Sequence, residues 1–532
     1  MIRIALILSL LLSFSPWSSA QEAQEEESPG AEAFLGQQRP ISLRAAEVLA
    51  LENNLEIEIA RTGPLIAEEG IAAARGAFDP ELGASYRFNH NEDPIFSSLQ
   101  GSGQTTVQED EWNYSGGFQG LLPFGATYTS RLSQRRLESD SRIVSLDTEW
   151  RGVWRNELRV PLLKNLIHNE ANVRVKRSRV ARDVSYEEFR RELSALIERI
   201  HQAYWELSAA RAEERVAQKS LQLAKDLLEQ TRVQYDVGVV SKVSVTQAEA
   251  GVAEREVDAI VAKNRAAAAQ DALLNLVLAP DSRGYAETEL IPSAPAYIDY
   301  QADLDAALAQ ALENRPELAA ARKQVEDAEI QLSFAQNQRL PALDLTGSFQ
   351  VQGLSGDAKA PEDLLFAPTT TPRDLGSSSD VFDDFFTQDG AQSWHVGANV
   401  SIPLGNTTAR AVEAERRIEL RRARATLKRV EQTVMLEVRG AIRGLRSARE
   451  ALEAAERRRI AQEETLRAEQ EKLRLGDSTP FDVLDIEEDL AEAERQEILA
   501  LQSYRNAITA LERGQATLLT SRGISVVREL TR

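Results

Sequence analysis

The residues best suited to catalysis or metal binding are few and scattered along this chain. It has no cysteine, so neither a disulfide framework nor a thiolate metal site can form. The four histidines, His90, His168, His201 and His395, do not lie at metal-ligand spacing from one another. Residues 101–106 (GSGQTT) are glycine-rich but lack the lysine of a phosphate-binding loop. The sequence therefore predicts no enzyme, no cofactor and no metal site.

Composition restricts the class of protein further. The chain has 532 residues, is 42% hydrophobic and carries a formal net charge of −21. That length allows several domains or one very elongated one. Because binding to a phosphate backbone needs clustered lysine and arginine, the acidic balance excludes nucleic acid as an expected partner.

The N-terminus has the pattern of a secretory signal peptide, predicted over residues 1–20. Arg3 precedes an apolar run at 4–12, and small residues at 18–20 come before Gln21. The run is too short to cross a bilayer, and an uncleaved anchor is the alternative. No later stretch is apolar for the roughly 18 residues that a spanning helix needs. A closed β-barrel is then the one membrane-spanning structure open to the mature chain.

The chain repeats itself once. Residues 50–57 (ALENNLEI) recur as 311–318 (ALENRPEL), and 160–162 (VPL) recur as 402–404 (IPL). Each copy reads as helix, strands, long helix, tight turn and helix. A repeat of this length is too long for a solenoid unit, so it predicts two similar halves of one architecture.

The repeat sets the expected domain boundaries. They are a signal peptide at 1–20, an N-terminal periplasmic segment at 21–42, a first repeat at 43–279 with strands about 80–161, an inter-repeat linker at 280–303, a second repeat at 304–514 with strands about 341–404, and a C-terminal tail at 515–532.

Helical periodicity dominates both repeats. Long helices are predicted at 171–237 and 409–475, and shorter ones at 43–75, 243–278, 304–338 and from about 480. Apolar residues from Leu193 to Ala210 follow a heptad spacing, which predicts supercoiled packing. Each long helix would be roughly 100 Å long, and the shorter helices of each repeat sum to about the same length. We therefore expect a tall cylinder of antiparallel helices with the strands at one end.

The predicted strands suit a membrane surface but are too few to close a barrel. Leu82, Ala84, Tyr86 and Phe88 alternate with more polar residues, as in a strand with one apolar face. Each chain has at least four predicted strands, or six if a hairpin at 112–136 joins them. Since open edges must pair, a homotrimer would have about 12 or about 18 strands. A soluble β-sandwich and a solvated coiled-coil stalk are the alternatives.

Two helix-connecting segments and the strand exits carry a family resemblance. Residues 235–249 read YDVGVVSKVSVTQAE and residues 473–490 read LRLGDSTPFDVLDIEEDL. With VPLL and IPLG at the ends of the strands, they resemble the TolC family of outer-membrane efflux proteins over nearly all of the mature chain. The resemblance implies an α+β membrane protein with a long antiparallel α-helical barrel and a transmembrane β-barrel completed by trimerisation, built from two internal repeats.

The resemblance also implies a function and partners. A homotrimer would lie in the lipid of the outer membrane of a Gram-negative bacterium and extend far into the periplasm. It would be the passive exit duct of a tripartite efflux pump or type I secretion system. Its partners would be a periplasmic adaptor (membrane fusion) protein and an inner-membrane transporter, which supplies the energy. The sequence does not specify the cargo or the transporter.

The same resemblance assigns roles to the tips of the two helical hairpins. Val237, Gly238 and Val239 in the first tip, and Leu475 and Gly476 in the second, match positions that form the periplasmic entrance and contact the adaptor. Glycine gives the backbone freedom that each tight reversal needs.

Two carboxylates beyond the second tip match residues of the family that point into the narrowing pore. Threefold symmetry would make Asp482 and Asp485 into rings that favour cations, and crowding would raise their pKa values. The alternative is that both are solvated helix-start residues that complement the helix dipole.

The chain departs from the family at three positions of the entrance. Ser478 replaces an arginine, Leu473 an aromatic residue, and Ser244 an aspartate of the first hairpin. The links that close other family entrances are therefore not reproduced, so closure either depends on other contacts or is looser.

The alternative function is a soluble periplasmic coiled-coil adaptor or scaffold without a pore. An adaptor should carry a lipoyl-like β-domain beside one hairpin, and the sequence shows none. Membrane fractionation distinguishes the two functions, because an adaptor would stay soluble or follow the inner membrane.

Overall fold

The computed structural model describes residues 39–95, 105–141, 143, 145–278, 289–294, 296–360, 376–387, 391–475 and 477–531. The predicted signal peptide, most of the predicted N-terminal segment and residues 101–104 lie outside these ranges, as does Gly476 of the second tip. Among the described residues, no helix combines the length and apolar character needed to cross a membrane.

The chain divides into two compact units. Unit 1 comprises residues 1–54, 203–295 and 468–491, and unit 2 comprises residues 55–202, 296–467 and 492–532. Two long helices, α4 (Glu170–Asp236) and α9 (Thr407–Leu475), contribute to both units. Their bounds lie within two residues of those predicted from the sequence.

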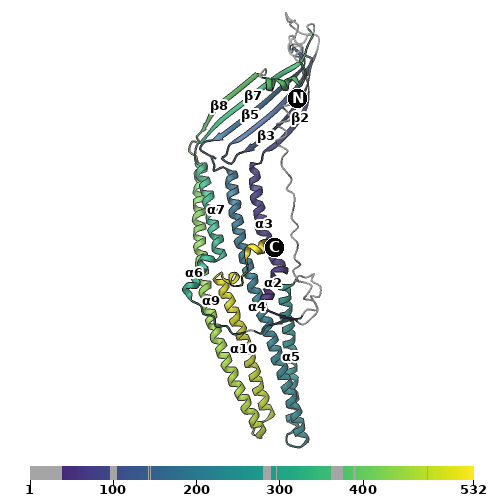
Figure 1. The fold of residues 1–532 in the computed structure, drawn as a ribbon, viewed down its shortest axis with the longest axis vertical. Helices are drawn as coiled ribbons and strands as arrows, with labels where there is room; N and C mark the ends of the chain where they lie inside the picture. Colours follow the sequence, from purple (N-terminus) through teal and green to yellow (C-terminus); the bar gives the residue numbers. More distant parts are fainter. Residues whose placement is uncertain are drawn as a thin grey trace. The chain divides into compact units, whose positions relative to one another are not determined.

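Unit 2 contains a six-stranded antiparallel sheet with the strand order β2-β3-β4-β5-β7-β8 (Figure 1). The pairing of β5 with β7 joins the strands of the first repeat to those of the second. Each chain therefore contributes six strands, the larger of the two counts that the sequence left open. The strands are β2 (Glu81–Pro94), β3 (Thr106–Leu121), β4 (Thr127–Ser139), β5 (Leu146–Pro161), β7 (Ala342–Ala358) and β8 (Ala391–Ser401).

The turn between β3 and β4 lies where Pro123-Phe124-Gly125 predicts it. Gly125 has a φ of +97°, and its amide donates to the carbonyl of Leu122 over 2.8 Å. A Cβ added to Gly125 would lie 2.4 Å from the carbonyl oxygen of Asn165, so both the backbone conformation and the space require glycine here.

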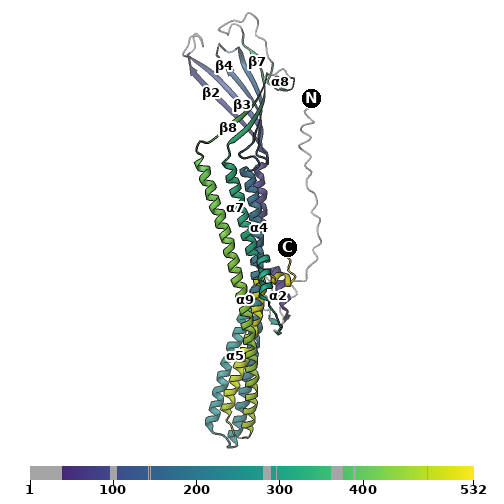
Figure 2. The same cartoon turned by 90° about the vertical axis from the view of Figure 1, so that its left-hand side faces the viewer.

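The Gly-, Pro-, Asp- and Ser-rich composition of residues 354–391 predicts a loop, and this prediction is wrong in part. Strand β7 continues to Ala358, and helix α8 (Asp380–Thr387) lies beside it (Figure 2). Val381 and Phe385 of α8 are buried against Val351 and pack with tryptophans of β5. Gly152 makes room for this helix, since a Cβ there would lie 2.3 Å from Cγ1 of Val381. Residues 361–375 and 388–390 of the predicted loop lie outside the described residues.

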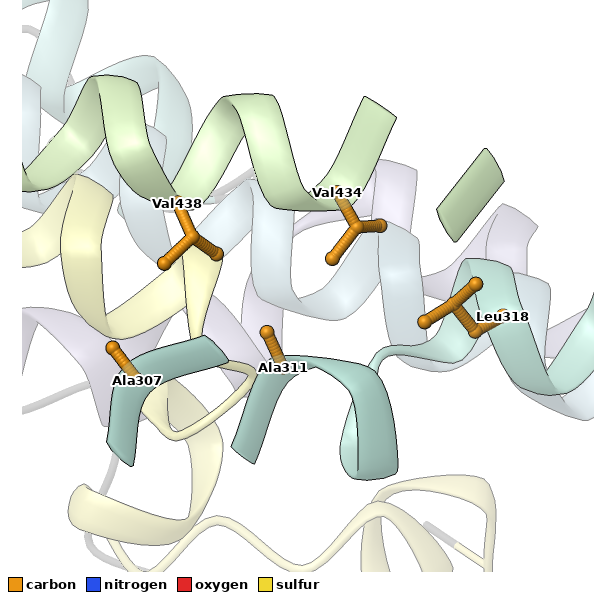
Figure 3. Close-up of a cluster of buried hydrophobic side chains, with 5 residues drawn as sticks. All are labelled: Ala307, Ala311, Leu318, Val434 and Val438. Carbon is orange, nitrogen blue, oxygen red and sulfur yellow. The ribbon is translucent and has the colours of Figure 1, made fainter. Parts of the chain in front are cut away.

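Two helices predicted to be continuous are each broken, and those predictions were wrong. Residues 304–338 form α6 (Leu304–Asn314) and α7 (Pro316–Gln338), and residues 43–75 form α2 (Leu43–Asn53) and α3 (Leu55–Arg75). The residue before a proline is disfavoured in the α conformation, and Arg315 is accordingly extended. Figure 3 shows why the break is tolerated, because Ala311 of α6 and Leu318 of α7 both face valines of α9.

A second core of unit 2 joins α9 to α10 (Pro480–Gly514). Leu445 and Leu452 of α9 are buried against Tyr504, Ile508 and Leu511 of α10. The tail beyond α10, predicted over 515–532, contains two short helices, α11 (Leu518–Ser521) and α12 (Val526–Thr531).

Unit 1 contains the part of α4 from Ala203 onwards, α2, α5 (Lys242–Val277), residues 468–475 of α9 and residues 480–491 of α10. A short parallel pair, β1 (Arg39–Ile41) and β6 (Leu290–Pro292), was not predicted and lies partly within the predicted linker. The Tyr204 hydroxyl holds this pair, donating to the Ile41 carbonyl and accepting from the Ser293 amide, each over 2.9 Å.

Most residues of the predicted heptad spacing are buried on α4, and Ala203 is half-buried. Leu193, Leu196 and Ile200 are at most 1% exposed, and Leu207 and Ala210 are equally buried. Both short and long apolar side chains at this spacing therefore face neighbouring elements rather than solvent.

Candidate functional site

The first hairpin, formed by α4 and α5, reverses at a turn around Gly238. The Val239 amide donates to the Gln234 carbonyl over 2.8 Å, and the Gly238 amide donates to the Tyr235 carbonyl over 2.9 Å. These two bonds define a Schellman motif, whose left-handed residue is usually glycine. Gly238 has a φ of +79°. The sequence prediction of a glycine-dependent turn is confirmed at this tip.

The second hairpin, formed by α9 and α10, ends its long helix with the equivalent bond. The Asp477 amide donates to the Lys472 carbonyl over 2.9 Å, which spans the same number of residues as the bond from Val239 to Gln234. The two repeats therefore end their long helices with related hydrogen bonds. Gly476 lies outside the described residues.

Both turns present apolar side chains to solvent. In the first tip, Val237 is 70% exposed and Val239 is 72% exposed. In the second, Leu475 is 70% exposed and Phe481 is 55% exposed. Exposed apolar side chains gathered at one place are typical of a protein-binding surface.

Asp482 has a structural role at the start of α10. Its Oδ2 accepts from the Thr479 amide over 3.0 Å and from the Thr479 hydroxyl over 2.6 Å. The Asp482 amide in turn donates to the Thr479 hydroxyl oxygen over 3.3 Å, which completes a reciprocal capping box. The Thr479 hydroxyl and then its amide lower the pKa of Asp482 within the single chain. The crowding that would raise this pKa requires neighbouring copies.

Asp485 lies one turn further along α10 and is also exposed. It has no hydrogen bond or ion pair to any residue within the described ranges. Residues three apart are neighbours on a helix surface, so Asp482 and Asp485 share one face of α10. Val483 and Leu484 are buried on the opposite side.

The two hairpins pack together through an apolar group that we call the entrance cluster. It consists of Ala224 and Leu227 of α4 and Leu484 of α10, with Val252 of α5 and Leu473 of α9 packed against them. Leu473, which replaces an aromatic residue of the family, is therefore part of an apolar contact. Gly251 of α5 permits this approach, because a Cβ there would lie 3.2 Å from Cδ1 of Leu484.

An ion pair lies beside the entrance cluster. The Arg255 guanidinium of α5 donates to Oε2 of Glu488 on α10 over 3.0 Å. The Arg255 side chain is only 8% exposed, and Asp258 also lies 3.6 Å from it. A buried guanidinium needs such partners, so this pair holds the first hairpin to the second.

Two of the substituted entrance residues bond within their own hairpins. The Ser244 amide donates to the Ser241 hydroxyl oxygen over 3.3 Å at the start of α5. The Lys472 ammonium and the Ser478 hydroxyl lower the pKa of Glu469, and Lys472 donates to Glu469 over 2.8 Å. Neither serine replaces the charged link between hairpins that the resemblance implies.

Sequence reasoning missed the residues that join the hairpins. Arg255, Glu488 and Leu484 carry no local motif, and their pairing depends on how the two repeats meet. The cap could have been found, since Thr479-Pro480-Phe481-Asp482 matches the spacing of a capping box with proline at the first helical position.

Comparison with known proteins supports the interpretation of fold and site. The model of the family described as "Outer membrane efflux protein" matches residues 307–514, which lie within the predicted second repeat. Outer membrane protein TolC of Vibrio cholerae is 24% identical over 333 residues, covering 61% of this chain and 68% of TolC.

Two solved outer-membrane proteins share the fold. The CmeC outer membrane channel of Campylobacter jejuni has a TM-score of 0.62 at 14% identity, covering 92% of this chain and 88% of CmeC. The outer membrane protein VceC of Vibrio cholerae has a TM-score of 0.60 at 17% identity, covering 89% of this chain and 95% of VceC.

These comparisons confirm the predicted resemblance and the class of protein that it implies. The chain has the TolC-like channel fold, and residues 307–514 match the outer membrane efflux family. The predicted class of function, an outer-membrane exit channel for efflux and not an enzyme, is confirmed. The predicted location in the outer membrane, with a helical extension into the periplasm, is confirmed as well.

Proposed function

We propose that three copies of this chain form a passive duct whose periplasmic entrance consists of the two hairpin tips. The observation that carries the proposal is the pair of related turns, one from each repeat, with apolar side chains exposed at both. Six such tips around a threefold axis would form one continuous apolar rim. The duct would serve a tripartite efflux pump or a type I secretion system.

The rim would bind a periplasmic adaptor through Val237, Gly238, Val239, Leu475 and Gly476. Apolar side chains that are 70% exposed in the single chain gain most from burial in an interface. The adaptor would connect the duct to an inner-membrane transporter, which supplies the energy for export.

The carboxylates of Asp482 and Asp485 would line the constriction just inside this rim. Asp482 has two compatible roles, since one of its oxygens caps α10 and the carboxylate stays exposed. Three copies would bring together six carboxylates, and rings of acidic side chains favour the passage of cations.

The test is ion selectivity in a planar lipid bilayer. Asp482→Asn combined with Asp485→Asn should weaken the preference for cations, measured as the shift of the reversal potential in a salt gradient. Asparagine retains a side-chain oxygen for the cap. The control is Glu471→Gln, because Glu471 is exposed on α9 beside the same turn and pairs with Arg474 of its own helix.

The reversal potential shows whether the two aspartates line the pore or serve only at the start of the helix. A reversal potential that shifts in the double variant and stays at the wild-type value in the control supports the pore ring. An unchanged reversal potential in the double variant would leave both aspartates as helix-start residues alone.

A further inference from the structure

The sheet of unit 2 ends in two unpaired strands. Strand β2 forms one edge and β8 the other in the order given above, and each pairs on one side only. Side chains of both edges are far more exposed than those of the inner strands, with Leu82 83% and Trp394 72% exposed. Unpaired backbone groups at membrane depth cost several kcal/mol each, so these edges need a partner.

The two faces of the sheet differ sharply in polarity. Opposite residues on paired strands share a face, so the register identifies rows that cross the sheet. One row is polar on every strand and consists of Glu81, Gln119, Thr129, Glu157, Ser348 and His395. The next row, on the other face, consists of Leu82, Phe118, Ser130, Asn156, Phe349 and Trp394.

The same division continues along the strands. The apolar face includes Tyr86, Trp112, Tyr114, Leu132, Trp154, Leu158, Val351, Val396 and Val400. The polar face includes Arg87, Asn113, Arg131, Arg135, Arg151, Arg155, Gln350 and Ser393. Helix α8 covers Val351 and Trp154 of the apolar face. Elsewhere the alternation is that of a membrane barrel with lipid outside and water inside.

The β3–β4 hairpin follows this alternation in part: β3 places Trp112, Tyr114 and Phe118 on the apolar face, whereas β4 also places Ser130, Gln134 and Arg136 there. On β4, Arg131 lies on the polar face and its neighbour Leu132 on the apolar face. Strand β3 pairs with β2 through 14 residue pairs, from Glu81 with Gln119 to Pro94 with Thr106. The hairpin is therefore part of the wall and not an attachment to a four-stranded sheet.

We propose that the barrel has 18 strands, closed by pairing β2 of each copy with β8 of the next, an inference that rests on the trimeric duct proposed above. Five successive antiparallel pairings separate β2 from β8, so these two strands run in opposite directions. Closure between copies is thus antiparallel throughout and gives the even count that such barrels have.

The strand number sets the class of solute that the barrel passes. Barrel diameter grows roughly linearly with strand number, so 18 strands give a lumen roughly half again as wide as 12. Barrels of about 16–18 strands leave a water-filled channel. The polar face then lines a passage for bulky hydrated solutes rather than a narrow pore.

Cysteine labelling tests whether the hairpin forms part of the wall, because the chain has no cysteine of its own. Arg131→Cys should react with a charged, membrane-impermeant thiol reagent in trimers in lipid vesicles, and labelling should reduce the conductance. Leu132→Cys should be protected by lipid. His395→Cys and Val396→Cys are the matched pair on β8, with His395 on the polar face.

Crosslinking tests the closure itself. Ser85→Cys on the polar face of β2 is combined in turn with Ser393→Cys, His395→Cys and Gly397→Cys on β8. Oxidation should produce covalent dimers and trimers most strongly for one partner. The combination of Ser85→Cys with Val396→Cys, on opposite faces, should produce none.

The results separate this inference from the function on which it rests. Equal labelling at residues 131 and 132, while the β8 pair behaves as expected, would place the hairpin outside the wall and overturn the count of 18. Absence of all intermolecular crosslinks would overturn the β2–β8 closure. A wild-type protein that conducts no current would instead contradict the proposed duct.

Discussion

The Arg255 guanidinium donates to Glu488 over 3.0 Å and so joins a helix of the first repeat to a helix of the second. The pair lies beside the entrance cluster in unit 1, the unit that contains both turns. Ser244 and Ser478 bond within their own hairpins, whereas this pair and the entrance cluster are contacts between the hairpins among the described residues. We expect them to set how easily the entrance opens.

Breaking this ion pair should favour the open state. Arg255→Ala removes the link, and the partial exposure of Glu488 limits its contribution to about 1 kcal/mol per copy. The open fraction in single-channel recordings should therefore rise by roughly fivefold or more. Arg232→Ala is the control, because Arg232 pairs with Glu249 across the first hairpin alone. An equal rise in both variants would show that general loosening is the cause.

Substitution of two leucines of the second hairpin should affect different properties, one the stability of the chain and the other its binding to the adaptor. Leu484 is 8% exposed within the entrance cluster, so Leu484→Ala should lower the free energy of unfolding by about 2–4 kcal/mol. Leu475 is 70% exposed, so Leu475→Ala should leave the stability unchanged and weaken adaptor binding. Thermal unfolding and pull-down with the cognate adaptor measure the two effects. Loss of stability in Leu475→Ala would contradict the assignment of that side chain to a free surface.

The first turn should tolerate only residues that accept a positive φ. Gly238→Ala places a Cβ on a left-handed residue and should cost about 1–2 kcal/mol locally, although the space around it is open. Gly238→Asn should largely restore the turn, because asparagine adopts this conformation more readily. Local amide hydrogen exchange at Val239 reports the change. Equal protection in the alanine variant and the wild type would mean that the turn carries no such constraint.

A buried carboxyl should make the packing of the two hairpins sensitive to pH. Glu487 is 8% exposed, and burial raises its pKa, although Arg255 and Lys219 oppose the rise. The folded chain then holds a proton at pH values where the unfolded chain has lost it. Stability should therefore fall as the pH rises from the ordinary value of 4.5 through the raised pKa.

Glu487→Gln should remove the loss of stability that results from ionising a buried carboxyl group. Its melting temperature should exceed that of the wild type at about pH 7, and the difference should disappear at about pH 4, where the wild-type carboxyl is protonated in both states. Glu488→Gln is the neighbouring control and should lower stability instead, because it weakens the bond to Arg255. A Glu487→Gln variant with the wild-type pH profile would contradict the assignment.

The repeat and the helical periodicity predicted much of this fold. The long helices end within two residues of their expected positions because glycine turns and apolar spacing are local signals. The break at Arg315 was also locally encoded, by Pro316, but the surrounding helical pattern obscured it. Strand β6 and helix α8 were missed because each is short and gains its stability from distant partners, β1 and the β5–β7 surface.

The residues of the candidate site likewise fall into two groups, those that local sequence predicts and those that it does not. The residues of the turns and the cap of α10 are local in sequence, so Gly238 and Asp482 could be singled out in advance. The contact of Leu484 with Leu227 and the bond from Arg255 to Glu488 depend on the meeting of two repeats more than 200 residues apart along the chain. No spacing within either repeat predicts which side chains will meet there.

The most direct test is fractionation of cells that express the full chain, followed by single-channel conductance of the protein purified from the fraction that contains it. Wild-type protein and the Arg255→Ala variant are compared in planar lipid bilayers. We expect discrete current steps from both, with the variant open for more of the time. A chain that stays in the aqueous fraction and produces no current, even with Arg255 removed, would contradict the claim that it forms an outer-membrane duct.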